Sequence, residues 1–106
     1  METHQKLYIV VRADLSQGLK LAQACHALRA FGARHPEIDR EWFERSNNIA
    51  VLVVPDEQKL RELLELTESR GLAVAPFLEP DLGDQMTALA LEPSAKRFLR
   101  RLPLAS

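Results

Sequence analysis

The fold is decided by residues 7–27, which read LYIVVRADLSQGLKLAQACHA. The apolar run Leu7–Val11 is continuous and rich in β-formers, which is typical of a central strand covered on both faces. A polar turn follows it. The residues from about Gln17 to Arg34 are good helix formers, and Pro36 disfavours a helical residue just before it. The segment therefore predicts a strand, a sharp turn and a helix, and in open α/β sheets ligands usually bind at such a junction.

The composition predicts one domain spanning residues 1–106, because 46% of the residues are hydrophobic and 27% are charged. Fourteen basic residues nearly balance 15 acidic ones, so any contact with RNA has to use a local basic patch. Cys25 is the single cysteine, and neither metal-ligand spacing nor a glycine-rich phosphate loop is present; we expect no metal and no cofactor. Without a long apolar run or a signal-peptide core, we expect no membrane contact and a cytoplasmic location.

The middle of the chain continues the alternation of helices and strands. Apolar and small residues surround the first helix, so we expect it to be largely buried. A short helix is predicted from Pro36 to about Arg45, with Ile38, Trp42 and Phe43 facing inward. The strand Ile49–Val54 follows, and then a helix that begins at Pro55 and ends before Gly71.

The last third of the chain predicts an antiparallel strand. The strand Ala73–Leu78 contains Pro76, which favours an edge position. Residues 79–84 are too few for a crossover helix, so the strand Met86–Leu91 should run antiparallel to a neighbour. Pro93 opens a last short helix, and residues 102–104 are expected to pack back on the body. The pattern as a whole predicts a three-layer α/β domain with a small mixed sheet.

This arrangement predicts a polar site at one edge of the sheet. If the first three strands are parallel, their carboxyl ends bring Arg12–Asp14 and the start of the first helix close to Glu79–Asp81. A helix amino end with convergent polar groups suits a phosphate or a polarised carbonyl.

Three features of this region have more than one interpretation. From spacing alone, Lys20 and Gln23 are expected on the solvated face of their helix. His26 continues the same diagonal, and a structural histidine competes with a catalytic base. The basic cluster Lys96–Arg101 fits a solvated helix end, and it is also a modest candidate for contact with nucleic acid.

Several short motifs, in their order and spacing, resemble the type 2 peptidyl-tRNA hydrolases of archaea and eukaryotes. The most specific is the A-Q-x-x-H-A box formed by Ala22–Gln23 and His26–Ala27. The resemblance extends over nearly the whole chain, and its other pieces are Val10–Val11–Arg12, Asp14–Leu15, Pro36–Glu37, Trp42, Val54–Pro55–Asp56–Glu57, Thr87–Ala88–Leu89–Ala90 and Pro93.

The resemblance implies a fold, a reaction and partners. The fold is a three-layer α/β/α sandwich with a four-stranded mixed sheet whose last strand is antiparallel. The reaction is hydrolysis of the ester that joins a peptide to the 3′ end of tRNA, so the expected partners are peptidyl-tRNA and, in a homodimer, a second copy of the chain. A lysine at the start of the first helix and a carboxylate after the third strand would act on the ester.

Carried over to this sequence, the resemblance implies seven site residues. The candidate catalytic residues are Lys20, Asp81 and His26, and the candidate substrate-binding residues are Arg12, Asp14, Gln23 and Glu79.

This sequence departs from the family pattern in two places. Lys20 lies one position beyond the family lysine, whose place Leu19 takes. The loop 79–84 is shorter and lacks the family's arginine and threonine, so Glu79, Asp81 and Asp84 compete for the carboxylate role, with Asp81 preferred and Glu79 second. The alternative function is a non-catalytic tRNA- or protein-binding or regulatory module on the same fold. Hydrolysis of another small ester or amide ranks below both.

Overall fold

The computed structural model describes residues 5–105 of the chain. The order of its elements is the one predicted from the sequence, with small shifts at their ends. The strands are β1 (Lys6–Arg12), β2 (Asn48–Val54), β3 (Val74–Glu79) and β4 (Gln85–Leu91). The α-helices are α1 (Gln17–Arg34), α2 (Pro36–Arg45) and α3 (Glu57–Ser69), and two 3₁₀ helices, η1 (Pro80–Leu82) and η2 (Pro93–Phe98), flank β4.

The strands form one mixed sheet in the order β2-β1-β4-β3. β1 pairs with β2 in parallel, and β4 pairs antiparallel with both β1 and β3. The first three strands therefore run in one direction and the last strand opposes them, which confirms the predicted mixed sheet. β3 lies at an edge, where the missing N–H of Pro76 is tolerated.

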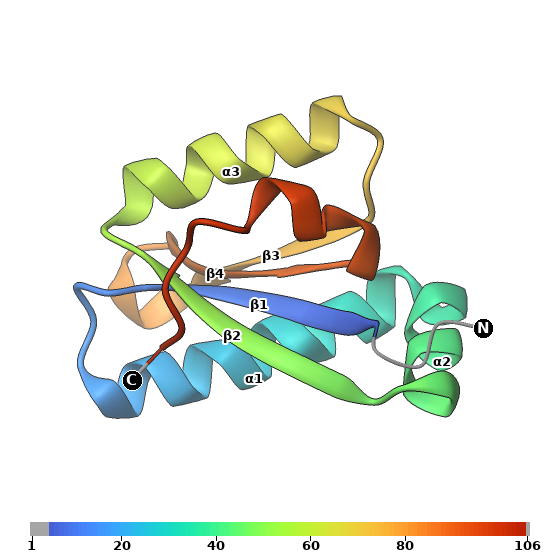
Figure 1. Ribbon diagram of the computed structural model, residues 1–106. Helices are drawn as coiled ribbons and strands as arrows, with labels where there is room; N and C mark the ends of the chain where they lie inside the picture. The colour runs from blue at the N-terminus through green and yellow to red at the C-terminus, as the bar shows by residue number, and fades with distance from the viewer. Residues whose placement is uncertain (1–4, 106) are drawn as a thin grey trace.

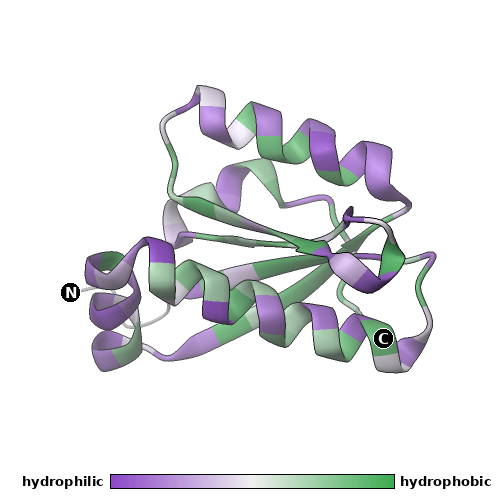
Figure 2. Ribbon diagram, turned by 180° about the vertical axis from the view of Figure 1, so that it is seen from behind, coloured by the Kyte–Doolittle hydropathy of each residue, from purple (hydrophilic) through white to green (hydrophobic). Residues whose placement is uncertain are grey.

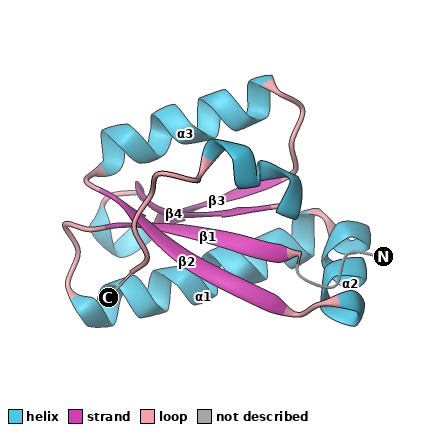
Figure 3. Ribbon diagram, in the orientation of Figure 1, coloured by secondary structure: helices cyan, strands magenta, loops and turns pink. Residues whose placement is uncertain are grey.

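Helices cover both faces of the sheet, so the domain has three layers (Figures 1 and 3). Alternate side chains of β1 enter two separate cores. Leu7, Ile9 and Val11 pack on the side of α1 and α2, whereas Tyr8 and Val10 pack on the side of α3 and η2. The β1 side chains are buried on both faces, as the unbroken apolar run in the sequence predicts.

Two expectations about the helices are wrong. α1 is not largely buried: its fully buried positions are Gln23, Ala27 and Phe31, which form one inward stripe. Figure 2 shows polar and apolar residues alternating along this helix. Phe43 does not face inward; it is 60% exposed, while Trp42 beside it is buried and donates from Nε1 to the Asn48 carbonyl at 2.7 Å. A short helix that contacts the body along one stripe has room for only one of two adjacent aromatic rings.

A side-chain cap at Asp56 and the backbone conformation of Gly71 mark the two ends of α3. Asp56 caps the helix by accepting the N–H of Lys59, so the helix starts at Glu57 and not at Pro55. Gly71 has a φ of 73°, which places it in the left-handed region expected just beyond a helix end.

The tail of the chain packs back on the body, as predicted. Val53 N–H donates to the Pro103 carbonyl at 3.0 Å, and Ala105 N–H donates to the Val51 carbonyl at 2.8 Å. The tail therefore covers part of the outer edge of β2, which would otherwise expose unpaired backbone groups. Within residues 5–105, no helix is long and apolar enough to cross a membrane.

Candidate functional site

The polar side chains predicted to form a site gather at one edge of the sheet. β1 and β3 end there, α1 begins there, and the turn 79–84 crosses it before β4 starts. In Figure 1 this edge is at the left, where the chain passes from β1 into α1. Ser16 caps α1 by accepting the N–H of Leu19 at 3.4 Å, so the amino end of the helix is fixed beside the strand ends.

Arg12 is the buried anchor of this edge. Its Nε and Nη2 donate to the two carboxylate oxygens of Asp14 at 2.9 and 3.0 Å, a planar two-bond pairing. Its Nη1 donates to Gln85 Oε1 at 2.8 Å and to the Met86 carbonyl at 3.3 Å. Arg12 therefore ties the end of β1 to the start of β4 and holds Asp14 in place.

Glu57, at the first turn of α3, completes the support behind Arg12. Its Oε2 accepts the N–H of Met86 at 2.8 Å and also pairs with Arg61. The N–H and the carbonyl of Met86 are thus both held by side chains, so the start of β4 has a fixed position relative to β1 and α3.

Gln23 forms the second part of the site, and its side chain is almost fully buried, with 1% exposed. Thr87 Oγ1 donates to Gln23 Oε1 at 2.7 Å, and Gln23 Nε2 donates to Glu79 Oε1 at 2.8 Å. An ionised carboxylate only accepts hydrogen bonds, which fixes the orientation of the amide. The result is a chain of hydrogen bonds from the buried hydroxyl to a carboxylate at the surface, and Gln23 is not on the solvated helix face that its spacing favours.

A break in the β3–β4 ladder positions Thr87. Phe77 pairs with Ala88 and Leu78 pairs with Met86, so Thr87 has no partner across the ladder. This extra residue is a β-bulge, which changes the direction of neighbouring side chains. Thr87 reaches Gln23 on α1, Ala88 belongs to the core on that same side, and Met86 packs on the opposite side.

The turn 79–84 presents its carboxylates in different ways. Glu79 Oε2 accepts the N–H of Asp81 at 3.2 Å, so both oxygens of Glu79 are engaged. The Asp81 side chain is exposed, as is that of Asp84. Gly83 and Asp84 adopt positive φ values of 64° and 61°, which reverse the chain into β4. The side chain of Glu79 is thus hydrogen-bonded to the side chain of Gln23. Asp81 contacts Glu79 only through its backbone N–H, and its own carboxylate points to solvent.

Lys20 and His26 flank these two groups. Lys20 is half-buried one turn before Gln23, whereas Leu19, in the place of the family lysine, is 37% exposed. The His26 ring stacks on Phe77 with centroids 4.5 Å apart and an angle of 17° between the planes. The other face of this ring is accessible because His26 is exposed.

Hydrogen bonds lower the pKa of two carboxylates of the site, Glu79 and Asp14. Hydrogen bonding by Gln23 is the main cause that lowers the pKa of Glu79; the Asp81 N–H and the nearby His26 act in the same direction. The pKa of Asp14 is lowered first by the hydrogen bonds from Arg12, and the charge of Lys20 contributes. At neutral pH this edge therefore presents two carboxylates beside cationic groups.

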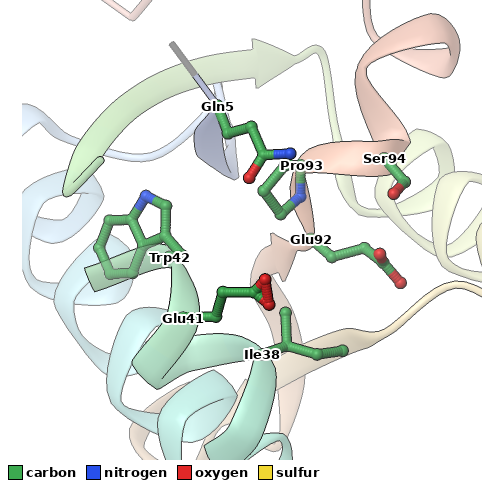
Figure 4. Close-up of a pocket in the computed structure, with 7 residues that line it drawn as sticks. All are labelled: Gln5, Ile38, Glu41, Trp42, Glu92, Pro93 and Ser94. Carbon is green, nitrogen blue, oxygen red and sulfur yellow. The ribbon is translucent and has the colours of Figure 1, made fainter. Parts of the chain in front are cut away.

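A hollow at the opposite end of the sheet lacks this chemistry. It has a volume of about 200 Å³ and is lined by Gln5, Ile38, Glu41, Trp42, Glu92, Pro93 and Ser94 (Figure 4). This lining contains two carboxylates and no cation, and Glu92 is already used to accept the N–H of Ala73 at 2.6 Å. An anionic or carbonyl ligand would find no charged donor there.

Sequence reasoning missed Thr87 and Gln85 as members of the site. Thr87 was visible only as part of the family motif around β4, and its role depends on the bulge. Gln85 carries no signal of its own, because an exposed glutamine at a strand start is common.

Comparison with known proteins agrees with this architecture. A family model described as peptidyl-tRNA hydrolase PTH2 matches residues 5–102. Comparison with curated proteins gives no match. A solved structure titled as a protein of unknown function, Atu0240, from Agrobacterium tumefaciens strain C58 is similar in fold, with a TM-score of 0.69 and 16% identity over 95% of this chain and 97% of that one. Since the family model covers nearly all of its described residues, the chain belongs to the PTH2 family of peptidyl-tRNA hydrolases.

Proposed function

We propose that this protein hydrolyses the ester between a peptide and the 3′ end of tRNA, with the carboxylate of Glu79 at the reacting centre. The observation that carries the proposal is the hydrogen bond from the buried amide of Gln23 to Glu79. A buried polar chain that ends on a carboxylate supports the proposal, because a catalytic group has to be held in one position. Lys20 is half-buried one turn before Gln23 on the same helix, and its charge acts on Asp14. Family membership supports the reaction class.

In the proposed reaction, Glu79 orients a water molecule and accepts its proton as the oxygen attacks the ester carbonyl carbon. Negative charge then develops on the carbonyl oxygen, where the Lys20 ammonium and the amino end of α1 stabilise it. Collapse of this intermediate breaks the bond between the carbonyl carbon and the ribose oxygen. The ribose oxygen takes up a proton from the protonated, accessible imidazole of His26, and the proton that Glu79 accepted from water then reprotonates His26 through solvent. The new carboxyl group releases its own proton to solvent, so the products are a peptide carboxylate and tRNA with a free terminal hydroxyl.

The remaining groups bind and orient the substrate in this proposal. Gln23 positions Glu79, while Arg12 and Asp14 fix the strand-to-helix turn that borders the scissile bond. Asp81 is the second candidate for the carboxylate role, because it lies on the same turn and is exposed. Peptidyl-tRNA is a product of translation, so the proposal places the protein in the cytoplasm.

The decisive experiment measures release of the acyl group from N-acetylated aminoacyl-tRNA by the wild-type protein and two variants. We expect Glu79→Gln to lower kcat/KM at least 100-fold and Asp81→Asn, the matched control in the same turn, to change it only a few-fold. Loss of activity in Asp81→Asn with activity kept in Glu79→Gln would move the role to Asp81. A wild-type protein without turnover would refute the function and leave a binding module.

We also propose that the chain forms a homodimer through the surface between α1, α2 and β2. Phe43 and Ile49 are exposed there, by 60% and 44%, and they border a cavity of about 440 Å³ whose lining includes Leu28 and Trp42. Exposed apolar side chains grouped around a hollow mark contact surfaces more often than isolated ones do.

A further inference from the structure

A strip of exposed cations runs along the face of the sheet that α3 and η2 cover. It consists of Arg70, just after α3, and of Lys96, Arg97, Arg100 and Arg101 on and after η2. These two elements lie side by side on one face of the sheet (Figure 1). We call this surface the basic strip, and none of its members belongs to the site described above.

The fold forces these cations outward. Ala95 and Leu99 are buried in the core below α3, with 0% and 3% exposed, and they anchor the segment to the sheet. Every exposed side chain from residue 96 to residue 101 is then a lysine or an arginine, because Phe98 is half-buried and Leu99 is buried. The packing therefore exposes all four cations of this short basic segment to solvent.

The strip lacks acidic partners of its own. Within residues 5–105, the ion pairs use Arg12, Arg45, Lys59 and Arg61, and none uses a member of the strip. Instead, the guanidinium groups of Arg70 and Arg97 lie 5.4 and 5.0 Å from the centroid of the Phe98 ring. Cation–π contacts hold the two arginines at one place without neutralising them. The repulsion among five cations in a chain of net charge −1 is relieved when a polyanion binds.

The basic strip lies near the proposed active edge, because both adjoin the end of β2. Phe98 and Leu102 line a cavity of about 270 Å³ together with Val54 and Pro55, at the end of β2. The Val54 carbonyl accepts the N–H of Ala13 at 2.8 Å, and Ala13 lies between Arg12 and Asp14. The longest dimension of the molecule is 40 Å. The basic strip and the proposed active edge therefore lie on one small molecule, and a nucleic acid longer than the protein can contact both.

We propose that the basic strip binds phosphates of the tRNA body while the 3′ end occupies the edge at Gln23 and Glu79; this inference rests on the proposed function. Lysine and arginine contacts to phosphates position a nucleic acid without reading its sequence, as a hydrolase acting on many tRNAs requires. Attachment to an anionic membrane would use exposed apolar side chains. Ala95 and Leu99 are buried, and Leu66, which lines a cavity with Phe98, is 38% exposed, so the membrane is compared with tRNA directly in the test below.

The test compares two triple variants with equal loss of charge. Arg97→Gln, Arg100→Gln and Arg101→Gln remove part of the strip. Arg34→Gln, Arg40→Gln and Arg45→Gln remove three exposed arginines of α1 and α2, on the other face of the sheet. Binding of deacylated tRNA is followed by fluorescence anisotropy at several salt concentrations. We expect the strip variant to bind at least tenfold more weakly, with a salt slope reduced by about 2 to 3, and the control variant to bind like the wild type.

Kinetic measurements separate this inference from the proposed function. With full-length N-acetylated aminoacyl-tRNA, the strip variant should have a raised KM and an unchanged kcat. With the same acyl group on the 3′-terminal adenosine alone, both variants should match the wild type. If neither the wild type nor the variants hydrolyse either substrate but tRNA affinity still depends on the strip, the hydrolase function is refuted and the basic strip is supported as a tRNA-binding surface. Equal tRNA affinity of the two variants refutes the tRNA-binding role of the strip. Binding to phosphatidylserine vesicles that depends on the strip, while binding to tRNA does not, refutes it as well.

Discussion

The side-chain nitrogen of Gln23 lies 2.8 Å from Oε1 of Glu79 and donates a hydrogen bond to it. One partner is buried in α1 and the other stands at the end of the edge strand β3. Because Thr87 holds the oxygen of the same amide, Gln23 cannot turn away without leaving a buried polar group unpaired. The position of the Glu79 carboxylate is thus set from inside the protein.

The role of Thr87 can be tested with an isosteric change. Thr87→Val removes the hydroxyl and leaves Gln23 Oε1 without its donor, so we expect a loss of about 1–3 kcal/mol in the free energy of unfolding and a lower kcat. Thr67→Val is the matched control, because Thr67 is also buried but bonds only to carbonyls of α3. Urea unfolding and kcat are measured for both. Equal kcat values in the two variants would show that Thr87 does not position the site.

The pH at which kcat/KM falls on the acid side should depend on Gln23. The folded pKa of Glu79 is lowered, so its carboxylate stays ionised until the pH falls below the ordinary glutamate pKa of about 4.3. Gln23→Met keeps the volume but removes the donor, so the acid midpoint of kcat/KM should move to higher pH. His26 also acts on Glu79 through its charge, and this contribution is removed by repeating the profile in a His26→Gln background. An acid midpoint that does not move in Gln23→Met would contradict this assignment.

Lys20 is expected to supply the charge that stabilises the developing oxyanion. Lys20→Met should lower kcat about 100-fold, a typical loss for one such group. Lys59→Met, in an exposed ion pair on α3, is the control and should be neutral. A double variant, Leu19→Lys with Lys20→Leu, moves the cation to the place where the family carries it. If that double variant has the kcat of the wild type, the site accepts a cation from either position, and this would contradict the proposal that the charge must come from position 20.

Arg12 is expected to stabilise the fold through Asp14. Arg12→Lys keeps the charge but loses the two-bond pairing, and we expect a cost of roughly 1–2 kcal/mol, reduced because the Asp14 side chain is 44% exposed. The folded pKa of Asp14 is lowered, so its contribution is complete above the unfolded pKa of about 3.9 and disappears as the pH falls through the folded value. The difference in stability between wild type and variant should therefore shrink at low pH. Arg45→Lys, in an exposed pair, should show neither effect.

The proposed dimer is tested at its exposed aromatic residue. Phe43→Glu places a charge on the surface between α1, α2 and β2, and we expect it to convert a dimer into a monomer that stays folded, with a free energy of unfolding that no longer depends on protein concentration. Sedimentation equilibrium measures the mass. Leu21→Glu, on an exposed position of α1 that does not line the cavity, is the control. A wild-type protein that sediments as a monomer would refute the dimer.

Much of the fold is visible in the sequence because its signals are local. The unbroken apolar run of β1 predicts a strand buried on both faces, and Pro76 predicts an edge, since proline cannot donate to a neighbouring strand. The short turn 79–84 predicts the antiparallel direction of β4, because so few residues cannot cross the sheet. The gathering of Arg12, Asp14 and Glu79 at one edge follows from strand direction alone.

The helix faces were harder to predict. Phe43 and Trp42 are adjacent aromatic residues in the sequence, yet only the indole ring is buried, because the helix contacts the body along one stripe and the indole N–H finds the Asn48 carbonyl there. Gln23 looks like a solvated residue by type and spacing. Its burial depends on Thr87 and Glu79, which lie 64 and 56 positions away along the chain.

The sequence by itself determined the strand, turn and helix of residues 7–27, the mixed sheet and the edge where polar groups gather, because hydrophobic period, proline and turn length act over a few residues. Only the tertiary structure decided that Gln23 is buried and that Glu79 is the carboxylate it holds. The bulge opposite Phe77 and Leu78 turns Thr87 toward α1, and that direction depends on the pairing of two strands. No local preference of a threonine specifies it.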